Sequence, residues 1–272
     1  MKKSVKKVVS ILLASSMIFM LFACNNAANK NVTNSVKDKK TFTVGFDAEY
    51  PPFGYEKDGD YTGFDLEVAE KVCEMEGWEL IKQPIDWDAK DLELNAGNID
   101  CIWNGFTITG REDAYTWTRP YCDNSIVFIV RKDSDIKETK DLKGKYVVTQ
   151  AGSSGYAAIM EEENDALRES FGVLETTPDY NTAFMNLESG LCECVVVDIG
   201  VAKYQLNTKS DKFFMLEEPF TSEKYAIGFK KGNTELRDIV EKDVMELYKN
   251  GTFMDIAKKY SDYSVPDMVC LE

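Results

Sequence analysis

The sequence predicts an α/β protein of two lobes, and three observations support this fold class. Strand-like and helix-like segments alternate in βαβα order, which is typical of a parallel sheet covered by helices. This alternation occurs in two separate blocks, and apolar β runs at 125–131 and 225–229 are placed to cross between them. The length of 272 residues and the apolar content of 44% suffice for one or two domains with a sizeable core.

The first block begins after residue 40. Residues 41–45 (TFTVG) alternate in polarity and predict a strand, which leads into a turn-rich patch with two prolines at 47–54. Apolar side chains then recur near period 3.6 up to Gly77, so a helix is expected there, with Asp65 as its N-cap. The block is expected to contain strands at 41–45, 79–84 and 100–103 and helices at 65–76 and 88–96.

The second block repeats the pattern and is followed by two further helices. Gly190 is expected to end a helix here, as Gly97 does in the first block. Strands are expected at 145–149 and 192–197, helices at 156–163 and 181–188, and C-terminal helices at 233–250 and 251–260.

The composition excludes several classes of function. Histidine is absent, which removes Ser-His-Asp and Cys-His catalytic devices, imidazole bases and His-ligated metal sites. Lys and Arg total 32 against 47 Asp and Glu, a net charge of −15, so the basic surface that nucleic-acid binding needs is missing. The GxxxxGK[ST] and GxGxxG motifs are also absent. We therefore expect no metal, no cofactor and no nucleic-acid partner.

The first forty residues predict export and a lipid anchor. Four lysines precede an apolar run at 8–22, which is short for a membrane span and fits a signal peptide at 1–23. The run ends in Leu-Phe-Ala-Cys, which resembles a bacterial lipobox with Cys24 as the lipidated residue. The alternative is an ordinary signal peptide in which Cys24 is coincidental. Residues 24–40 are polar and are expected to form the lipid anchor and a flexible tether. Six further cysteines leave disulfide formation open, because the compartment permits disulfides but the spacings do not demand them.

Polar side chains follow four of the predicted strands, two in each block. Asp47 and the Gly105-Phe106-Thr107 segment follow strands of the first block, and residues 150–155 (QAGSSG) and Asp198 follow strands of the second. Because ligands of open α/β sheets bind at the carboxyl ends of strands, we expect these residues at one site. The guanidinium of Arg111 can hold a carboxylate bidentately and Asp198 can take an ammonium, so the pair suits a zwitterion.

Several motifs, taken together, resemble the polar amino-acid solute-binding proteins of ABC importers, the extracellular solute-binding family 3. The front signature combines TVGFD and YPPF within 43–53 with GFDLEVA at 63–69. Further matching motifs are NID at 98–100, GFTIT at 105–109, Arg111, DLKGK at 141–145 and NGTF at 250–253. The resemblance extends from about residue 41 to about residue 261. It departs from the family pattern at Gly110, which alone separates GFTIT from Arg111 where the family has two residues.

The resemblance implies a two-lobed, periplasmic-binding-protein-like type II fold whose α/β lobes are joined by two hinge strands. Lobe 1 is then expected at 41–125 and 226–272, lobe 2 at 131–220, and the hinge crossings at 126–130 and 221–225.

The resemblance also implies a role for each site residue. Arg111 is expected to hold the ligand α-carboxylate, helped by the backbone N–H groups of Thr107 and Ser154. Asp198 is expected to hold the α-ammonium, helped by the Gly105 carbonyl and the Thr107 hydroxyl. The remaining residues expected to bind or enclose the ligand are Asp47, Tyr50, Phe53, Trp87, Phe106, Gln150 and Ser153.

Each of these residues also has an ordinary structural interpretation. Asp47 can be an Asx-turn residue, Asp198 a helix cap, and Arg111 a surface arginine paired with a neighbouring carboxylate. Tyr50 and Trp87 can be core aromatics.

The function expected from the resemblance is an extracytoplasmic, membrane-anchored receptor that delivers an L-amino acid to an ABC permease and its ATPase subunit. It is expected to be a monomer and not an enzyme. A neutral polar or cystine-like ligand is favoured, a cationic one comes next, and an acidic one is least compatible with Asp47 and Glu49. The alternatives are a cyclohexadienyl-dehydratase-like enzyme on the same fold and a ligand-sensing or adhesin surface domain.

Overall fold

The computed structural model describes residues 39–272 of the chain. The predicted signal peptide, the lipidation site Cys24 and the tether up to residue 38 lie outside the described residues. Between residues 39 and 272, no helix is both long enough and apolar enough to cross a membrane.

The first lobe is built on a five-stranded sheet of order β5-β1-β6-β14-β7. Its strands are β1 (Thr41–Phe46), β5 (Glu79–Pro84), β6 (Cys101–Ile102), β7 (Thr116–Trp117) and β14 (Gly228–Phe229). β1 runs parallel to β5 and β6, and β14 runs antiparallel to β6 and β7. The helices of this lobe are α2 (Phe64–Glu76), α3 (Lys90–Ala96) after the 3-10 turn η2 (Trp87–Ala89), and α8 (Thr234–Lys249). A small sheet of β2 (Glu49–Tyr50), β3 (Gly54–Lys57) and β4 (Asp60–Thr62) completes it.

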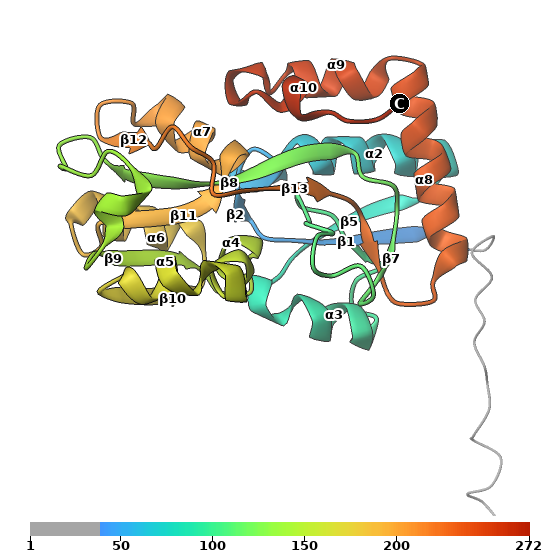
Figure 1. Cartoon of the computed structure of the whole chain (residues 1–272). Coiled ribbons are helices and arrows are strands. Elements are labelled where there is room, and N and C mark those ends of the chain that lie inside the picture. The colour runs from blue at the N-terminus through green and yellow to red at the C-terminus, as the bar shows by residue number, and fades with distance from the viewer. Residues whose placement is uncertain (1–38) are drawn as a thin grey trace, which may run out of the picture. The chain divides into compact units, whose positions relative to one another are not determined.

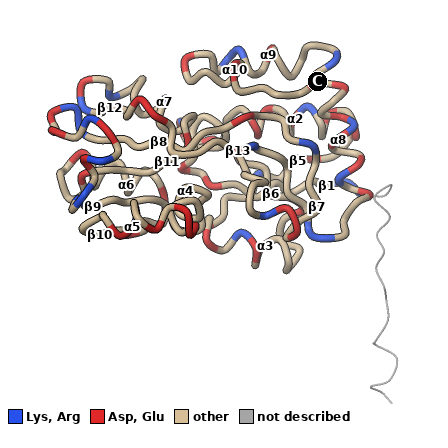
Figure 2. Tube along the Cα trace, viewed as in Figure 1, with Lys and Arg blue, Asp and Glu red and all other residues tan. Residues whose placement is uncertain are grey.

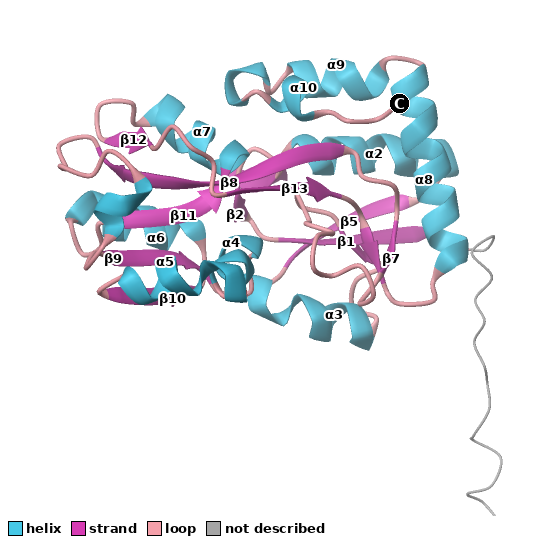
Figure 3. Cartoon of the chain, viewed as in Figure 1, coloured by secondary structure: helices cyan, strands magenta, loops and turns pink. Residues whose placement is uncertain are grey.

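The second lobe is built on a six-stranded sheet of order β10-β9-β11-β8-β12, with β13 also paired to β8. Its strands are β8 (Cys122–Arg131), β9 (Tyr146–Gln150), β10 (Val173–Thr177), β11 (Cys194–Asp198), β12 (Phe213–Met215) and β13 (Thr221–Tyr225). Its helices are α4 (Ser154–Ile159), α5 (Asp165–Ser170), α6 (Tyr180–Ser189) and α7 (Ile199–Thr208), and its 3-10 turns are η3 (Thr139–Leu142) and η4 (Glu162–Asn164). In both lobes the helices lie outside the strands (Figure 3).

Two antiparallel strands connect the lobes. β8 and β13 run side by side between the two halves of the molecule (Figure 1). The later part of β8 pairs with β11 of the second lobe, whereas its first part pairs with β13. The C-terminal elements α9 (Thr252–Lys258), η5 (Ser261–Tyr263) and α10 (Val265–Met268) follow α8, and η5 reaches α7 of the second lobe.

Some predicted elements have other bounds in the structure. The helix expected at 156–163 is α4, which begins at its N-cap Ser153 and ends at Ile159. The β run at 225–229 is divided, because Tyr225 ends β13 and β14 covers only Gly228–Phe229. The interpretation of Asp65 as an N-cap is wrong, since Gly63 occupies that position and α2 begins at Phe64.

Charged residues are dispersed over the described body. Lys and Arg alternate with Asp and Glu along both lobes rather than gathering on one element (Figure 2). This distribution gives no basic stripe along which a nucleic-acid backbone can lie.

Candidate ligand-binding site

The carboxyl ends of the strands in the two lobes face each other, as the sequence predicts. Asp47 follows β1 of the first lobe, and Gln150 ends β9 of the second. Gln150 Nε2 donates a 2.6 Å hydrogen bond to Asp47 Oδ2. Asp47 Oδ1 accepts from the Glu49 backbone N–H at 2.8 Å, so this residue both forms an Asx turn and contacts the opposite lobe. Burial raises the pKa of the Asp47 carboxyl.

Arg111 reaches the second lobe despite the shortened loop that precedes it. Gly110 adopts a left-handed φ of 76°, and the Arg111 N–H donates to the Ile108 carbonyl at 2.9 Å, which closes a tight turn. The guanidinium lies over the Phe106 ring and donates to the Thr107 carbonyl at 3.1 Å. It also donates to the carbonyl of Gly152, in the second lobe, at 3.2 Å. Within the described part of the chain, Arg111 forms no ion pair.

Lys90 is a second cation at this place, and the sequence analysis missed it. Its side chain is only 5% exposed. Its Nζ lies 3.3 Å from the Trp87 carbonyl and 3.3 Å from the same Gly152 carbonyl that Arg111 contacts. Burial lowers the pKa of Lys90, and the charge of Arg111 lowers it further. The sequence analysis expects a helix at 88–96 but assigns no role to Lys90, which follows Trp87 by three residues at the start of that helix.

Asp198 ends β11 and lies in a buried network with both hinge strands. Its Oδ1 accepts hydrogen bonds from Asn124 Nδ2 and from the Tyr225 hydroxyl, both at 2.7 Å. Its Oδ2 accepts a longer bond, 3.3 Å, from the Tyr180 hydroxyl. The Tyr225 hydroxyl also lies 2.9 Å from that of Tyr50. Burial raises the pKa of Asp198. Asp198 also precedes α7, but its side chain makes no capping bond.

Glu223, on β13, is a buried carboxylate in the same network that the sequence analysis does not single out. Its Oε1 accepts from Thr107 Oγ1 at 2.5 Å, from Asn124 Nδ2 at 2.7 Å and from Ser154 Oγ at 2.9 Å. This one oxygen therefore contacts both lobes and both hinge strands. Burial and the charge of Asp198 raise the pKa of Glu223 to about 7. The segment TSEKY is polar up to Tyr225, so no pattern in the sequence marks Glu223 as buried.

Gly105 is held in place by Asp65. The Gly105 N–H donates to Asp65 Oδ2 at 2.6 Å, and the Tyr121 hydroxyl donates to the same oxygen at 2.8 Å. Gly105 has a left-handed φ of 54°, and a Cβ added there would lie 2.9 Å from the Tyr50 ring. This glycine is required both by the backbone conformation and by the close approach of the ring.

The remaining predicted site residues, which are Phe53, Trp87, Phe106 and Ser153, are all buried. Phe53 packs against Tyr50 and Tyr225, and Trp87 packs edge-on against Phe106. Ser153 Oγ caps α4 by accepting from the Tyr156 N–H. Phe106 is fully buried in an aromatic cluster of the first lobe. The contact of each of these residues with a ligand stays a prediction.

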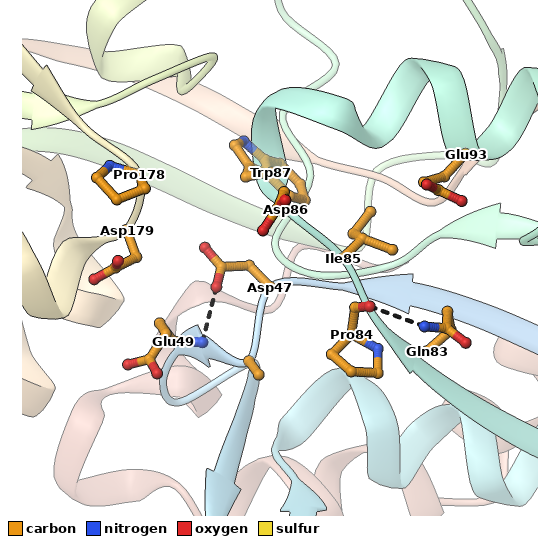
Figure 4. A pocket seen from close by; sticks show the side chains of 11 residues that line it. Asp47, Glu49, Gln83, Pro84, Ile85, Asp86, Trp87, Glu93, Pro178 and Asp179 are labelled. Atoms are coloured by element: carbon orange, nitrogen blue, oxygen red, sulfur yellow. Dashed lines mark hydrogen bonds between the residues drawn. The ribbon is translucent and has the colours of Figure 1, made fainter.

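A cavity of about 450 Å³ opens beside Asp47 and Trp87 (Figure 4). It is formed by both lobes, and its lining residues are Asp47, Ala48, Glu49, Gln83, Pro84, Ile85, Asp86, Trp87, Glu93, Pro178 and Asp179. Five of these are carboxylates and none is Lys or Arg. Burial, followed by the charges of Asp179 and Asp47, raises the pKa of Glu49, which shows that the carboxylates repel one another. Among residues 39–272, no group of His, Cys, Asp or Glu is arranged to hold a metal ion.

Two α/β lobes joined by a pair of hinge strands, with polar side chains of both lobes in contact between them, form the architecture of the type II periplasmic solute-binding class. Residues 42–263 match the family described as bacterial extracellular solute-binding proteins, family 3, and the chain belongs to this family.

Individual relatives cover nearly the whole chain. The L-cystine-binding protein TcyJ of Escherichia coli K12 is 28% identical over 95% of this chain and 95% of its own length. The arginine-binding extracellular protein ArtP of Bacillus subtilis 168 is 28% identical over 94% of this chain and 98% of its own. A crystal structure of an ABC uptake transporter substrate-binding protein from Streptococcus pneumoniae with bound histidine superposes with a TM-score of 0.78. That protein is 33% identical, and the match covers 82% of this chain and 93% of the other.

These matches confirm the predicted family and the two-lobed type II fold. The chain is a solute-binding protein and not an enzyme, and its location is extracytoplasmic. The lobe boundaries given above stay predictions.

Proposed function

We propose that this protein is the receptor of an ABC importer and traps an L-amino acid between its lobes. The observation that supports this best is the placement of Arg111 and Asp198. They come from different lobes, Arg111 reaches across to Gly152 of the second lobe, Asp198 bonds to Asn124 on a hinge strand, and neither has an ion-pair partner among the described residues. A zwitterion supplies the missing charge to each.

Lobe closure follows from this arrangement. The α-carboxylate binds Arg111 of the first lobe, and the α-ammonium binds Asp198 of the second. A ligand that contacts both lobes binds the closed form more tightly than the open form and shifts the hinge equilibrium toward closure. The permease then recognises the closed form. No bond is made or broken, so no general acid or nucleophile is needed.

The side chain of the ligand carries a positive charge at its far end. The cavity beside Asp47 and Trp87 is lined by five carboxylates without a compensating cation. An arginine or lysine side chain places its charge among these carboxylates and its stem against the Trp87 ring. The relative named for arginine and the histidine-bound structure agree with this class, whereas the relative named for L-cystine does not. The proposal places a cationic ligand before a neutral one, whereas the sequence analysis favours a neutral polar or cystine-like ligand and places a cationic one second.

Two features outside the described residues belong to the same proposal. Cys24 carries the lipid that anchors the receptor to the outer face of the membrane, and the polar tether lets it reach a permease with its ATPase subunit. The protein acts as a monomer. Loss of membrane fractionation in Cys24→Ala, and elution of the tether-free protein at monomer size, are the corresponding tests.

The receptor function is tested by a thermal-shift screen of residues 25–272 against the twenty L-amino acids, ornithine and cystine. A ligand at 100 times its dissociation constant adds about 2.7 kcal/mol of stability. Each charge-assisted hydrogen bond contributes about 1.5–3 kcal/mol, so Arg111→Ala and Asp198→Asn should each weaken binding about 10- to 150-fold. Arg119→Ala, at an exposed arginine paired with Glu241, is the matched control. An unchanged melting temperature with every amino acid would refute the receptor function.

The ligand class is tested with isosteric pairs of compounds. L-Arginine should bind at least about 10-fold more tightly than L-citrulline, and L-lysine more tightly than Nε-acetyllysine, because only the charged members pair with the carboxylates. Asp47→Asn should reduce this discrimination, whereas Asp60→Asn, at an exposed position, should not. Tighter binding of the neutral compounds would refute the ligand class and leave the receptor function standing.

A further inference from the structure

The hinge region contains a buried pair of carboxylates that no cation neutralises. Asp198 and Glu223 are 2% and 7% exposed. Both accept a hydrogen bond from the same amide nitrogen, Asn124 Nδ2, at 2.7 Å. Within residues 39–272, neither carboxylate has a Lys or Arg nitrogen within 4.0 Å. Buried carboxylates are costly unless a cation or a proton balances them.

The hydrogen bonds of this carboxylate pair are incomplete. Glu223 Oε1 accepts three bonds, but Oε2 accepts none from the described residues. Among residues 39–272, Asp198 Oδ2 accepts a hydrogen bond only from the Tyr180 hydroxyl, at 3.3 Å. Asn124 is 3% exposed, and its Oδ1 is a buried oxygen without a hydrogen-bond partner. A flip of the Asn124 amide would not remedy this, because it would place Oδ1, which cannot donate, against both carboxylates in place of Nδ2.

Glu223 Oε2, Asp198 Oδ2 and Asn124 Oδ1 are thus three neighbouring acceptor oxygens without a strong hydrogen-bond donor among the described residues. An ammonium group is a positive charge with three N–H donors. Burial of such a group beside the pair supplies both the missing charge and the missing hydrogen bonds.

We propose that Glu223 is a second carboxylate of the ligand's ammonium site, where it acts together with Asp198 and the unpartnered Asn124 oxygen. This inference rests on the proposed amino-acid receptor function. Glu223 contacts Thr107 of the first lobe and Ser154 of the second, so it joins the ammonium group to both lobes at the hinge itself.

Ammonium binding at this pair releases a proton. Burial and the charge of Asp198 raise the pKa of Glu223 to about 7, and an arriving cation lowers it again. The other titratable groups that face Glu223 are Asp198 on β11, Tyr180 on α6 and Tyr225 on its own strand. Burial raises the pKa of both phenols, so they stay neutral. Ligand affinity therefore increases as the pH rises toward about 7 and levels off above it, by at most about tenfold per pH unit for one proton.

The experiment compares wild type, Glu223→Gln and the control Glu218→Gln, which changes an exposed glutamate five residues away. Glutamine keeps an oxygen that can accept the bonds from Thr107, Asn124 and Ser154, so the fold is retained. The probes are the L-amino acid that gives the largest thermal shift and the same compound without its α-amino group. These analogues are 5-guanidinopentanoate for arginine, imidazole-propionate for histidine, 4-carbamoylbutanoate for glutamine and 3,3′-dithiodipropionate for cystine. Titration calorimetry at pH 5.5–8.5, in buffers of different ionisation enthalpy, measures affinity and proton release together.

Glu223→Gln should weaken binding of the amino acid about 10- to 100-fold at pH 8 and leave the desamino analogue unaffected. Wild type and Glu218→Gln should release a proton near pH 6.5, and Glu223→Gln should not. Equal weakening toward both compounds would make Glu223 a hinge residue without a ligand contact and overturn the proposal. If the desamino analogue is too weak to measure, unchanged proton release in Glu223→Gln overturns it. If no amino acid binds wild type, the receptor function itself fails, which is a distinct result.

Discussion

Asp65 couples the stability of the fold to pH, and Asp65→Asn should remove that coupling. The carboxyl group is fully buried, and one of its oxygens holds both the Gly105 N–H and the Tyr121 hydroxyl. Its other oxygen has no hydrogen-bond partner within residues 39–272. An asparagine carbonyl can accept the same two bonds but carries no titratable proton.

The magnitude follows from the pKa of this group. Burial raises the pKa of Asp65 from 3.8 to about 7. Because the folded-state pKa lies above the unfolded-state value, the fold prefers the protonated acid. The contribution to stability is complete below about pH 4 and is lost as the pH rises to about 7. Three pKa units at about 1.4 kcal/mol each give an upper bound of about 4 kcal/mol.

Urea denaturation at pH values between 4.5 and 8.5 measures the effect. Relative to wild type, Asp65→Asn should gain unfolding free energy across this interval, and the gain should stop above about pH 7.5. Asp60→Asn, at an exposed aspartate in the neighbouring hairpin, should follow wild type throughout. Parallel curves for wild type and Asp65→Asn would refute the reasoning. Asp65→Ala should in addition weaken ligand binding, because it leaves the Gly105 N–H without its acceptor.

Three further substitutions test how the site is built. Gly105→Ala should destabilise the protein by about 1–2 kcal/mol and weaken amino-acid binding, because its Cβ would lie 2.9 and 3.0 Å from two tyrosine rings at a left-handed φ; melting and calorimetry measure both effects. Lys90→Met should leave the free energy of unfolding in urea unchanged or raise it, because the substitution removes a buried charge beside Arg111. It should nevertheless weaken amino-acid binding about tenfold, because it removes a cation from the place where the ligand α-carboxylate is proposed to bind. Tyr204→Ala removes the ring contact between α7 of the second lobe and Tyr263, which is worth about 0.5–1.5 kcal/mol. The ligand-free protein should then open more, so its radius of gyration in X-ray scattering should increase. An unchanged radius of gyration would contradict this prediction.

The fold could be predicted from the sequence because its helix ends carry local signals. Gly77, Gly97 and Gly190 all adopt the left-handed conformation that ends α2, α3 and α6 where the sequence analysis expects it. Helix starts were less predictable. Asp65 has the residue type of an N-cap, but a tertiary contact with Gly105 draws it into the core instead.

The site was predictable only in part, for a related reason. Asp47, Gln150 and Asp198 could be placed at the ends of their strands from the sequence, because strand ends in an α/β sheet converge whatever the details of packing; their contact with a ligand stays a prediction. Glu223 and Lys90 do not lie at such ends. Glu223 faces the site because of the register in which β13 pairs with β8, and Lys90 because α3 begins against the loop at Gly152. Neither the pairing register nor the contact between lobes has a local signature.

The charges of the cleft make recognition and closure one event. Arg111 and Lys90 converge on the single neutral carbonyl of Gly152, and Asp198 and Glu223 share the single neutral amide of Asn124. Each pair brings like charges together in a buried place, which is unfavourable by itself. A carboxylate relieves the first pair and an ammonium relieves the second, but a ligand with only one of these groups leaves the other pair unbalanced. The contacts at Gly152 exist only when the lobes meet, so the free energy gained by neutralising that pair is available only in the closed form. Under the proposed function we therefore expect an amino acid to drive closure, and a simple amine or a simple carboxylate to bind without closing the lobes fully.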